Sequence, residues 1–217
     1  MAHVRLEGFH AVKHALRFAP ELVGEVEVAD VDAVRALALR LAPDVLPALL
    51  ARTVPPAGPV AHHTGVQALA ERPEPAPACL TARTSPLVLL DAPRHPGNVG
   101  AVVRVAAAAG ASGVAVTGDL DPWAPAVLRG SAGLHYALPV LAVDVAQVSG
   151  PLVVLDAGGD PGAPVPADAV LVVGSERSGV GELLRARADA VVALPMRPGV
   201  SSLNLATAVA AVLYRCR

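Results

Sequence analysis

The chain has 217 residues, of which 53% are hydrophobic and 17% charged, which excludes an intrinsically disordered chain and allows a packed core. No apolar run reaches the roughly 20 residues that a membrane-spanning helix needs, and the first residues lack the apolar stretch of a signal peptide. The net charge of −2 gives no global indication of a nucleic-acid partner. The positive charge is carried almost wholly by arginine, which suits bidentate contact with phosphate, and Lys13 is the only lysine.

The cysteines and histidines give no sign of a metal site. Cys79 and Cys216 lack metal-type spacing and form no disulfide framework. His62 and His63 follow a proline-rich stretch and are interpreted as surface residues. We therefore expect no metal and no membrane partner, and a cytoplasmic protein.

Residues 1–76 predict a small α/β domain. Apolar residues recur at helical spacing in three stretches, and a short strand-like alternation lies between the first two. The expected elements are a helix over 8–18, a strand over 26–29, a helix over 31–42 capped by Asp30 or Asp32, and a short helix over 44–52. Proline is dense over 73–86 and the apolar periodicity is lost there, so we expect a linker at residues 77–86.

Residues 87–217 predict a doubly wound α/β domain with a mostly parallel, Rossmann-like sheet. Short runs rich in Val and Leu alternate with helical patterns, as in strands that are buried on both faces. The expected strands are 87–90, 114–116, 152–155, 170–173 and 191–194, and the expected helices are 100–109, 125–131, 182–188 and 203–214.

Three loops follow predicted strands of this second domain, where open α/β sheets bind their ligands. They are DAPRHPGNVGAVVRVAAAAG from Asp91, GSERSGVG from Gly174 and PMRPGVSSLN from Pro195. None contains a P-loop, and G-x-G-x-x-G does not follow the first strand. Ser175 lies in G-S-E-R-S-G and not in the G-x-S-x-G of a hydrolase elbow. These familiar nucleotide-binding and hydrolase sites are therefore disfavoured.

Taken together, the loops resemble the SpoU/TrmH branch of the SPOUT RNA methyltransferases. The stretch DPWAPAVLRGSAGLHYALPV also resembles the link between the second and third strands of that family. The resemblance covers residues 87–217 in the right order and spacing. The residues that fill the three motifs are Asp91, Pro96, Asn98, Gly100, Arg104, Ala106 and Gly110, then Gly174, Glu176 and Gly179, and finally Pro195, Met196, Ser202, Leu203, Asn204, Leu213 and Tyr214.

The resemblance implies a SPOUT-type α/β knot, in which the C-terminal helix threads through an earlier loop to form a trefoil. It also implies a homodimer with the active site at the subunit interface. The N-terminal segments EGFHAVKHAL and HHTGVQAL resemble, more faintly, a ribosomal-protein-like substrate-binding domain. The implied reaction is methyl transfer from S-adenosylmethionine to a ribose 2′-hydroxyl of structured RNA, either rRNA or tRNA.

The same resemblance assigns the candidate site residues. The cofactor pocket is expected from Gly174, Ser175, Glu176, Leu194, Pro195, Met196, Ser202 and Leu203. The catalytic group is expected from Arg104, Asn98, Glu176, Ser202 and Asn204. A guanidinium with a pKa above about 12 is a poor base, so Arg104 is expected to stabilise the emerging alkoxide, with the Asn98 amide orienting it.

Simpler interpretations of these residues stay open. Asn98 can be only a helix N-cap, and Arg104 only a surface arginine. Glu176 can be solvated in a glycine-rich turn, while Ser202 and Asn204 can simply cap the last helix. At the level of the whole chain, a non-catalytic RNA-binding relative and a Rossmann-type dehydrogenase are the alternatives.

Overall fold

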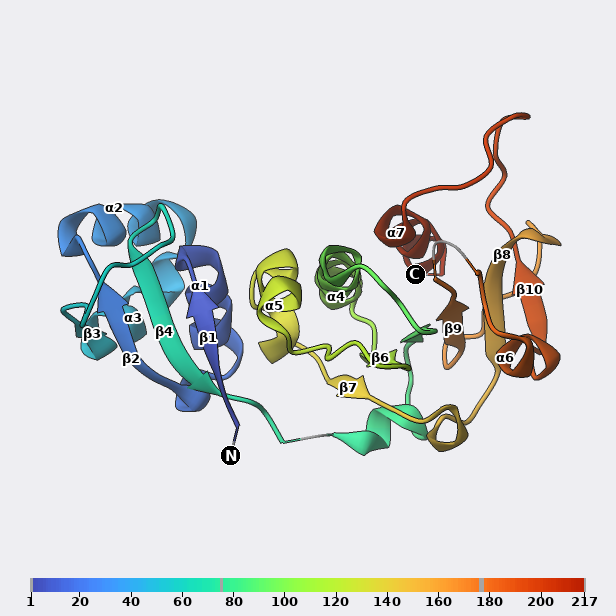
Figure 1. Ribbon diagram of the computed structural model, residues 1–217, viewed down its shortest axis with the longest axis horizontal. Helices are drawn as coiled ribbons and strands as arrows, with labels where there is room; N and C mark the ends of the chain where they lie inside the picture. Colours follow the sequence, from blue (N-terminus) through green and yellow to red (C-terminus); the bar gives the residue numbers. More distant parts are fainter. Residues whose placement is uncertain (1, 75, 176–177, 217) are drawn as a thin grey trace.

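Figure 1 presents the computed structural model, which describes residues 2–74, 76–175 and 178–216. The first sheet has the order β1-β4-β2-β3 and carries three α-helices. We call these elements the N-terminal unit. Their bounds are β1 His3–Glu7, α1 Phe9–Phe18, β2 Val23–Val28, α2 Val31–Leu41, α3 Leu46–Arg52, β3 Thr53–Val54 and β4 Val66–Glu71.

The helices of this unit follow the sequence pattern, whereas most of its strands do not. Asp30 caps α2 by accepting a hydrogen bond from the Ala33 backbone nitrogen at 2.9 Å. The strand expected at 26–29 begins earlier, since β2 runs from Val23 to Val28. We did not predict β1, β3 or β4. Strand β4 pairs antiparallel with both β1 and β2. These partners lie far from β4 in the sequence, so local sequence patterns do not predict the pairing.

The second sheet has six parallel strands in the order β10-β8-β9-β5-β6-β7. It agrees with the expected Rossmann-like sheet. The strands are β5 Leu87–Leu90, β6 Gly113–Val116, β7 Val140–Ala142, β8 Leu152–Asp160, β9 Val170–Val173 and β10 Ala190–Val192. The helices are α4 Pro96–Ala109, α5 Pro125–Ser131, α6 Glu182–Ala186 and α7 Leu205–Arg215.

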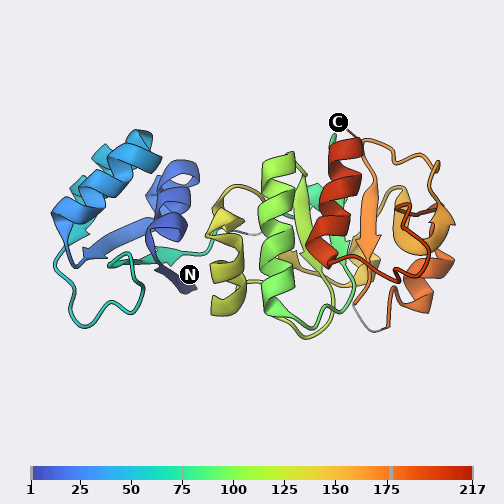
Figure 2. The ribbon, with the colours of Figure 1, turned by 90° about the horizontal axis from the view of Figure 1, so that it is seen from above.

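The central strand β5 shows why continuous apolar runs predicted this sheet. Leu87 and Leu89 pack in one apolar cluster that includes Leu184 of α6. Val88 and Leu90 pack in another, with helices α4, α5 and α7. All four strand residues are fully buried, so both faces of β5 are covered. Figures 1 and 2 show α5, α4 and α7 side by side along one face of the sheet.

Several predicted boundaries were wrong. Helix α4 starts at Pro96, four residues before Gly100, because proline is favoured in a first helical turn. Helix α7 starts at Leu205 and not at residue 203, because the Asn204 side chain caps it. Strand β10 ends at Val192, so Leu194 lies beyond the strand and not at its end. Helix α6 ends at Ala186 and not at residue 188. Strand β7 has no counterpart among the expected strands.

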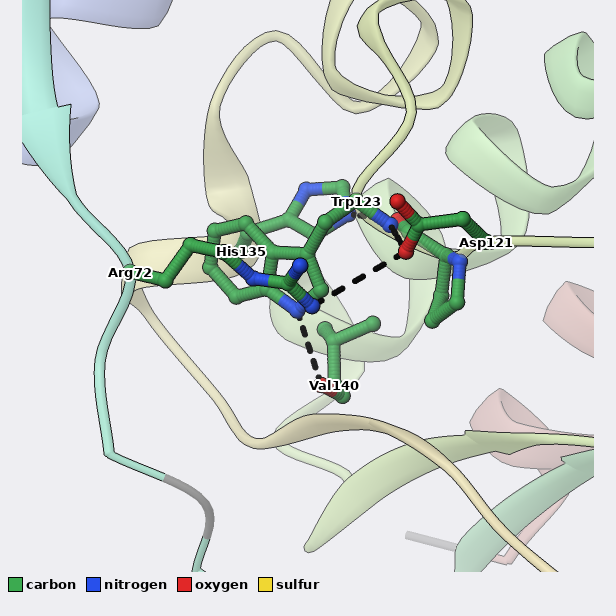
Figure 3. Close-up of polar contacts among 6 residues, drawn as sticks. Arg72, Asp121, Trp123, His135 and Val140 are labelled. Atoms are coloured by element: carbon green, nitrogen blue, oxygen red, sulfur yellow. Dashed lines mark hydrogen bonds and ion pairs between the residues drawn. The ribbon is translucent and has the colours of Figure 1, made fainter. Parts of the chain in front are cut away.

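An aromatic cluster joins the N-terminal unit to the second sheet (Figure 3). The Trp123 indole donates to the Val140 carbonyl at 3.0 Å, and the Arg72 guanidinium lies 5.1 Å from the Trp123 ring centroid. His135 is buried between Ser131 and Pro122, and this burial lowers its pKa to about 4, so the ring is neutral at pH 7. The Tyr136 hydroxyl donates to the Glu71 carbonyl at 3.1 Å, which ties β4 to this cluster.

The segment between the two sheets is itself partly packed. Residues Pro77–Leu80 form a 3₁₀ turn in which Cys79 and Leu80 are buried against the second sheet. The Arg83 guanidinium donates to three backbone carbonyls, those of Leu80, Ser149 and Asp168. This end of the segment is therefore held by the second sheet.

Helices α4 and α5 touch through glycine backbones. A Cβ added at Gly100 would lie 2.7 Å from Gly130 Cα and 2.8 Å from the Ser131 nitrogen. At those distances backbone atoms must shift, since no flexible side chain can give way. The close approach of the two helices thus requires glycine at position 100.

Gly100→Ala is expected to lower the free energy of unfolding by about 1–3 kcal/mol, as overpacking in a filled core does. Gly97→Ala in the same helix is the matched control, because a Cβ there meets nothing within 4 Å. Alanine at position 97 should leave stability unchanged or raise it by up to about 1 kcal/mol. Urea unfolding of both variants measures the difference, and equal stabilities would show that the helices do not need this contact.

Candidate active site at the carboxyl edge of the parallel sheet

A cavity of about 490 Å³ opens at the carboxyl edge of the parallel sheet. Its wall comes from the ends of β10 and β9, from the part of β8 just beyond its pairing with β9, and from the starts of α4 and α7. The lining residues are Asn98, 155–157, 173–175, 179–180, Leu194, Met196, 201–205 and Ala208. Both its position and its size are typical of ligand sites in open α/β folds.

The turn after β9 forms the floor of this cavity and is closed by backbone contacts. The Ser175 nitrogen donates to the Gly179 carbonyl at 3.2 Å, and the Gly179 nitrogen donates back to the Ser175 carbonyl at 3.0 Å. A Cβ at Gly174 would overlap the backbone of Gly179 and Val180. Gly174 therefore allows the chain to fold back on itself.

The buried Ser175 hydroxyl serves this turn. It lies 2.6 Å from the Ser178 hydroxyl and accepts from the Ser178 nitrogen at 3.3 Å. Among the described residues, the histidine rings form their hydrogen bonds with other partners, and none forms one with Ser175. A nucleophilic serine is thus disfavoured by the geometry as well as by the sequence.

Asp91, at the end of β5, holds the turn from the other side. Its carboxylate accepts from the Gly181 backbone nitrogen at 2.7 Å and from the Thr117 hydroxyl at 2.9 Å. Thr117 follows β6, so one carboxylate connects the ends of two strands to the turn after β9. From the sequence, Asp91 is only a residue of the first motif, and its position directly after a buried strand is the signal that points to it.

Asn98 and Asn204 meet across the cavity although they lie 106 residues apart. The Asn204 amide nitrogen donates to the Asn98 side-chain oxygen at 3.2 Å, while the Asn204 oxygen accepts from the nitrogens of Ala206 and Thr207. Asn204 therefore caps α7 and also lines the cavity. Asn98 is not an N-cap, because His95 holds that position in α4.

Most of the predicted site residues come together at this cavity. The lining contains the predicted cofactor residues Gly174, Ser175, Leu194, Met196, Ser202 and Leu203, and the predicted catalytic residues Asn98, Ser202 and Asn204. Pro195 is not among the lining residues. Glu176, predicted for both roles, lies outside the described residues.

Arg104 lies apart from the cavity. It is exposed on α4, and within the described chain no hydrogen bond or ion pair engages its guanidinium. Its charge instead acts on His10 and Lys13 of α1. The Asn98 side-chain oxygen accepts from Asn204. That the Asn98 amide orients Arg104 stays a prediction.

The sequence did not single out the wall formed by β8 just beyond its pairing with β9. Leu155, Asp156 and Ala157 line the cavity there. The Asp156 carboxylate accepts from the Gly158 nitrogen and pairs with Arg185, and these two contacts lower its pKa. The signal was the carboxyl-edge rule itself, which applies to the end of every parallel strand.

Among residues 2–74, 76–175 and 178–216, no group of three His, Cys, Asp or Glu side chains is placed to hold a metal ion. Within the same ranges, no helix has both the length and the apolar character required to cross a bilayer.

Asp91→Ala is expected to lower the free energy of unfolding by about 2 kcal/mol, since it removes hydrogen bonds to a charged acceptor and leaves their donors unpaired. Asp119→Ala is the control, because Asp119 is exposed in the loop after β6. Chemical unfolding of the two variants measures the difference. If Asp119→Ala lowers the free energy of unfolding as much as Asp91→Ala does, the loss comes from removing a negative charge and not from the hydrogen bonds of Asp91.

The chain is similar in sequence to known RNA methyltransferases. The SpoU rRNA methylase family model matches residues 85–214. A 23S rRNA (uridine(2479)-2′-O)-methyltransferase of Streptomyces viridochromogenes is 34% identical over 149 residues, which cover 58% of this chain and 50% of that protein. A 23S rRNA (guanosine(2553)-2′-O)-methyltransferase of Bacillus subtilis is 30% identical over 229 residues, covering 98% of this chain and 87% of that protein.

Solved structures agree in fold. The SpoU methyltransferase AviRb from Streptomyces viridochromogenes, in complex with the cofactor AdoMet, superposes with a TM-score of 0.80 at 26% identity, covering 99% of this chain and 89% of that one. The chain spans about half the length of the first two curated relatives that it matches. The family model covers more than half of the chain, and the chain therefore belongs to the SpoU rRNA methylase family.

Proposed function

We propose that this protein transfers a methyl group from S-adenosylmethionine to a ribose 2′-hydroxyl of rRNA or tRNA. One observation carries the proposal: three segments that resemble the family's motifs converge on one cavity, where Asn98 meets Asn204 beside the Gly174 turn. The relatives named as 2′-O-methyltransferases support the reaction, and the AviRb complex supports the cofactor.

The cavity suits S-adenosylmethionine in size and chemistry. Its volume of about 490 Å³ lies in the range of small-molecule sites. Leu194, Met196 and Leu203 offer an apolar bed for an adenine ring, while the side-chain-free Gly174 lets the backbone approach a ribose closely. When bound, the cofactor supplies an activated methyl group, so the protein has only to orient the acceptor and stabilise its charge.

Arg104 is proposed to stabilise the alkoxide that forms as the 2′-hydroxyl loses its proton. A guanidinium keeps its positive charge at any working pH, so it acts as an electrostatic partner and not as a base. Asn98, Ser202 and Asn204 carry amide and hydroxyl groups that can position the acceptor ribose. Glu176 is proposed to order the cofactor loop.

A homodimer completes this proposal. Arg104 does not line the cavity of its own chain, and a site shared between two copies would account for that position. We also propose the C-terminal trefoil knot of the family, a cytoplasmic location, and a division into an RNA-binding domain over 1–76, a linker over 77–86 and a catalytic domain over 87–217. The separate four-stranded and six-stranded sheets support this division.

Arg104→Ala is expected to slow methyl transfer about 100-fold to 1000-fold, the usual cost of losing one donor that stabilises transition-state charge. Binding of S-adenosylmethionine should stay within about twofold, because Arg104 lies outside the cavity. Transfer of labelled methyl groups to RNA from a strain lacking the gene measures the first quantity, and calorimetry measures the second.

Arg40→Ala, an exposed arginine on α2, is the matched control and should transfer at the normal rate. Full activity of Arg104→Ala would contradict the assigned role. A wild-type chain that binds RNA but not S-adenosylmethionine would instead support the non-catalytic relative.

A further inference from the structure

A group of basic side chains spans the junction between the N-terminal unit and helix α4. We define this junction cluster as His10 and Lys13 of α1, Arg104 of α4, and His62 and His63 of the loop before β4. His10, His63 and Arg104 are exposed, and the other two are partly exposed. Lys13 is the only lysine in the chain.

Glycine contacts bring the two helices to this junction. A Cβ added at Gly133 would lie 2.6 Å from the Ala11 carbonyl oxygen, so the turn after α5 touches the backbone of α1. His14 of α1 contacts the Ala132 carbonyl of the same turn at 2.7 Å. His10 lies one helical turn before His14 and thus on the same face of α1.

Arg104 lies on the α5-facing side of α4. It lies one helical turn after Gly100, so it shares the face of α4 that packs against α5. The 3₁₀ turn Leu134–Tyr136 contacts both α1 and α4 and lies between them. His10 and Arg104 therefore lie on either side of one short bridge.

The two loop histidines are fixed beside α1. A Cβ at Gly8, which has a φ of +87°, would meet the His62 ring at 2.5 to 2.7 Å. The His62 ring also lies 2.9 Å from the Thr64 hydroxyl, and its centroid is 4.3 Å from that of His63. This stack extends the cluster along the start of α1.

The nearby carboxylates are already engaged. Asp44 pairs with Arg17 at 2.6 Å through two hydrogen bonds, and Glu7 pairs with Arg129 at 3.2 Å. Partial burial and the charges of Lys13, Arg104, His62 and His63 lower the pKa of His10. Partial burial, Arg17 and Arg104 also lower the pKa of Lys13, against a weaker opposite effect of Asp44. Lys13 and Arg104 thus place two like charges beside His10, and a polyanion would offset the repulsion between them.

We propose that the junction cluster binds the phosphodiester backbone of the RNA substrate across both units. This inference rests on the proposed function and adds a binding surface to it. The cluster ends at Arg104, so a backbone held along α1 leads toward the residue assigned to the chemistry. Contact with phosphate carries no sequence information, and its strength falls as salt rises.

The direction of the pH effect follows from the charges. In the free protein the pKa of His10 is lowered, so the ring is largely neutral at pH 7. A bound phosphate favours the protonated ring and raises that pKa, so binding is coupled to proton uptake. Affinity should therefore rise as pH falls from 8 to 6, by up to about tenfold for each pKa unit gained on binding.

The experiment uses the full-length protein and a fluorescein-labelled oligouridylate as a probe of backbone contact, with affinity read by anisotropy across salt concentration and pH. His10→Gln/Lys13→Gln is expected to weaken binding at least about tenfold at low salt and to reduce the slope of log affinity against log salt by about 1.4, or about 0.7 for each lost contact. His10→Gln alone should reduce the rise in affinity between pH 8 and pH 6.

The controls are Arg40→Ala, which removes one exposed charge on α2, and His3→Gln, which removes an exposed histidine on β1. Both should keep the wild-type salt slope and pH dependence. Calorimetry with S-adenosylmethionine on every variant separates this inference from the proposed function, because the cluster variants should bind the cofactor as the wild type does. If His10→Gln/Lys13→Gln binds the probe with wild-type affinity and slope, or if Arg40→Ala weakens binding equally, the junction cluster is not the phosphate-binding surface.

Discussion

The backbone contact between Gly174 and Gly179–Val180 is the constraint on which the candidate active-site cavity depends. Strand β9 lies between β8 and β5 in the sheet, and its last residue leads directly into this turn. Any side chain at position 174 would push the turn away from the strand end. The Gly181 nitrogen would then leave the Asp91 carboxylate, and the cavity would lose its floor.

The parallel sheet could be predicted because burial on both faces leaves an unambiguous pattern. Leu87–Leu90 and Val170–Val173 matched residue for residue, since every position in them is apolar and covered. Short or edge strands such as β3 and β7 carry no such pattern, and tertiary pairing alone determines them. The Asn98–Asn204 contact could not be derived from local sequence, because the fold joins positions 106 residues apart. Their common role was inferred from a resemblance, and the placement of Arg104 away from the cavity was not foreseen.

The contacts between the two sheets give the N-terminal unit a defined place beside the helices of the second sheet. The aromatic cluster around Trp123 (Figure 3) holds the end of β4. The turn at Gly133 holds α1. A surface that begins on α1 can therefore continue onto α4.

The most direct measurement is a crystal structure of the protein with S-adenosylmethionine bound. Electron density for the cofactor is expected in the cavity, against the backbone of Gly174 and the side chains of Leu194, Met196 and Leu203. Density at any other place, with this cavity filled only by solvent, would contradict the assignment of the carboxyl edge as the active site.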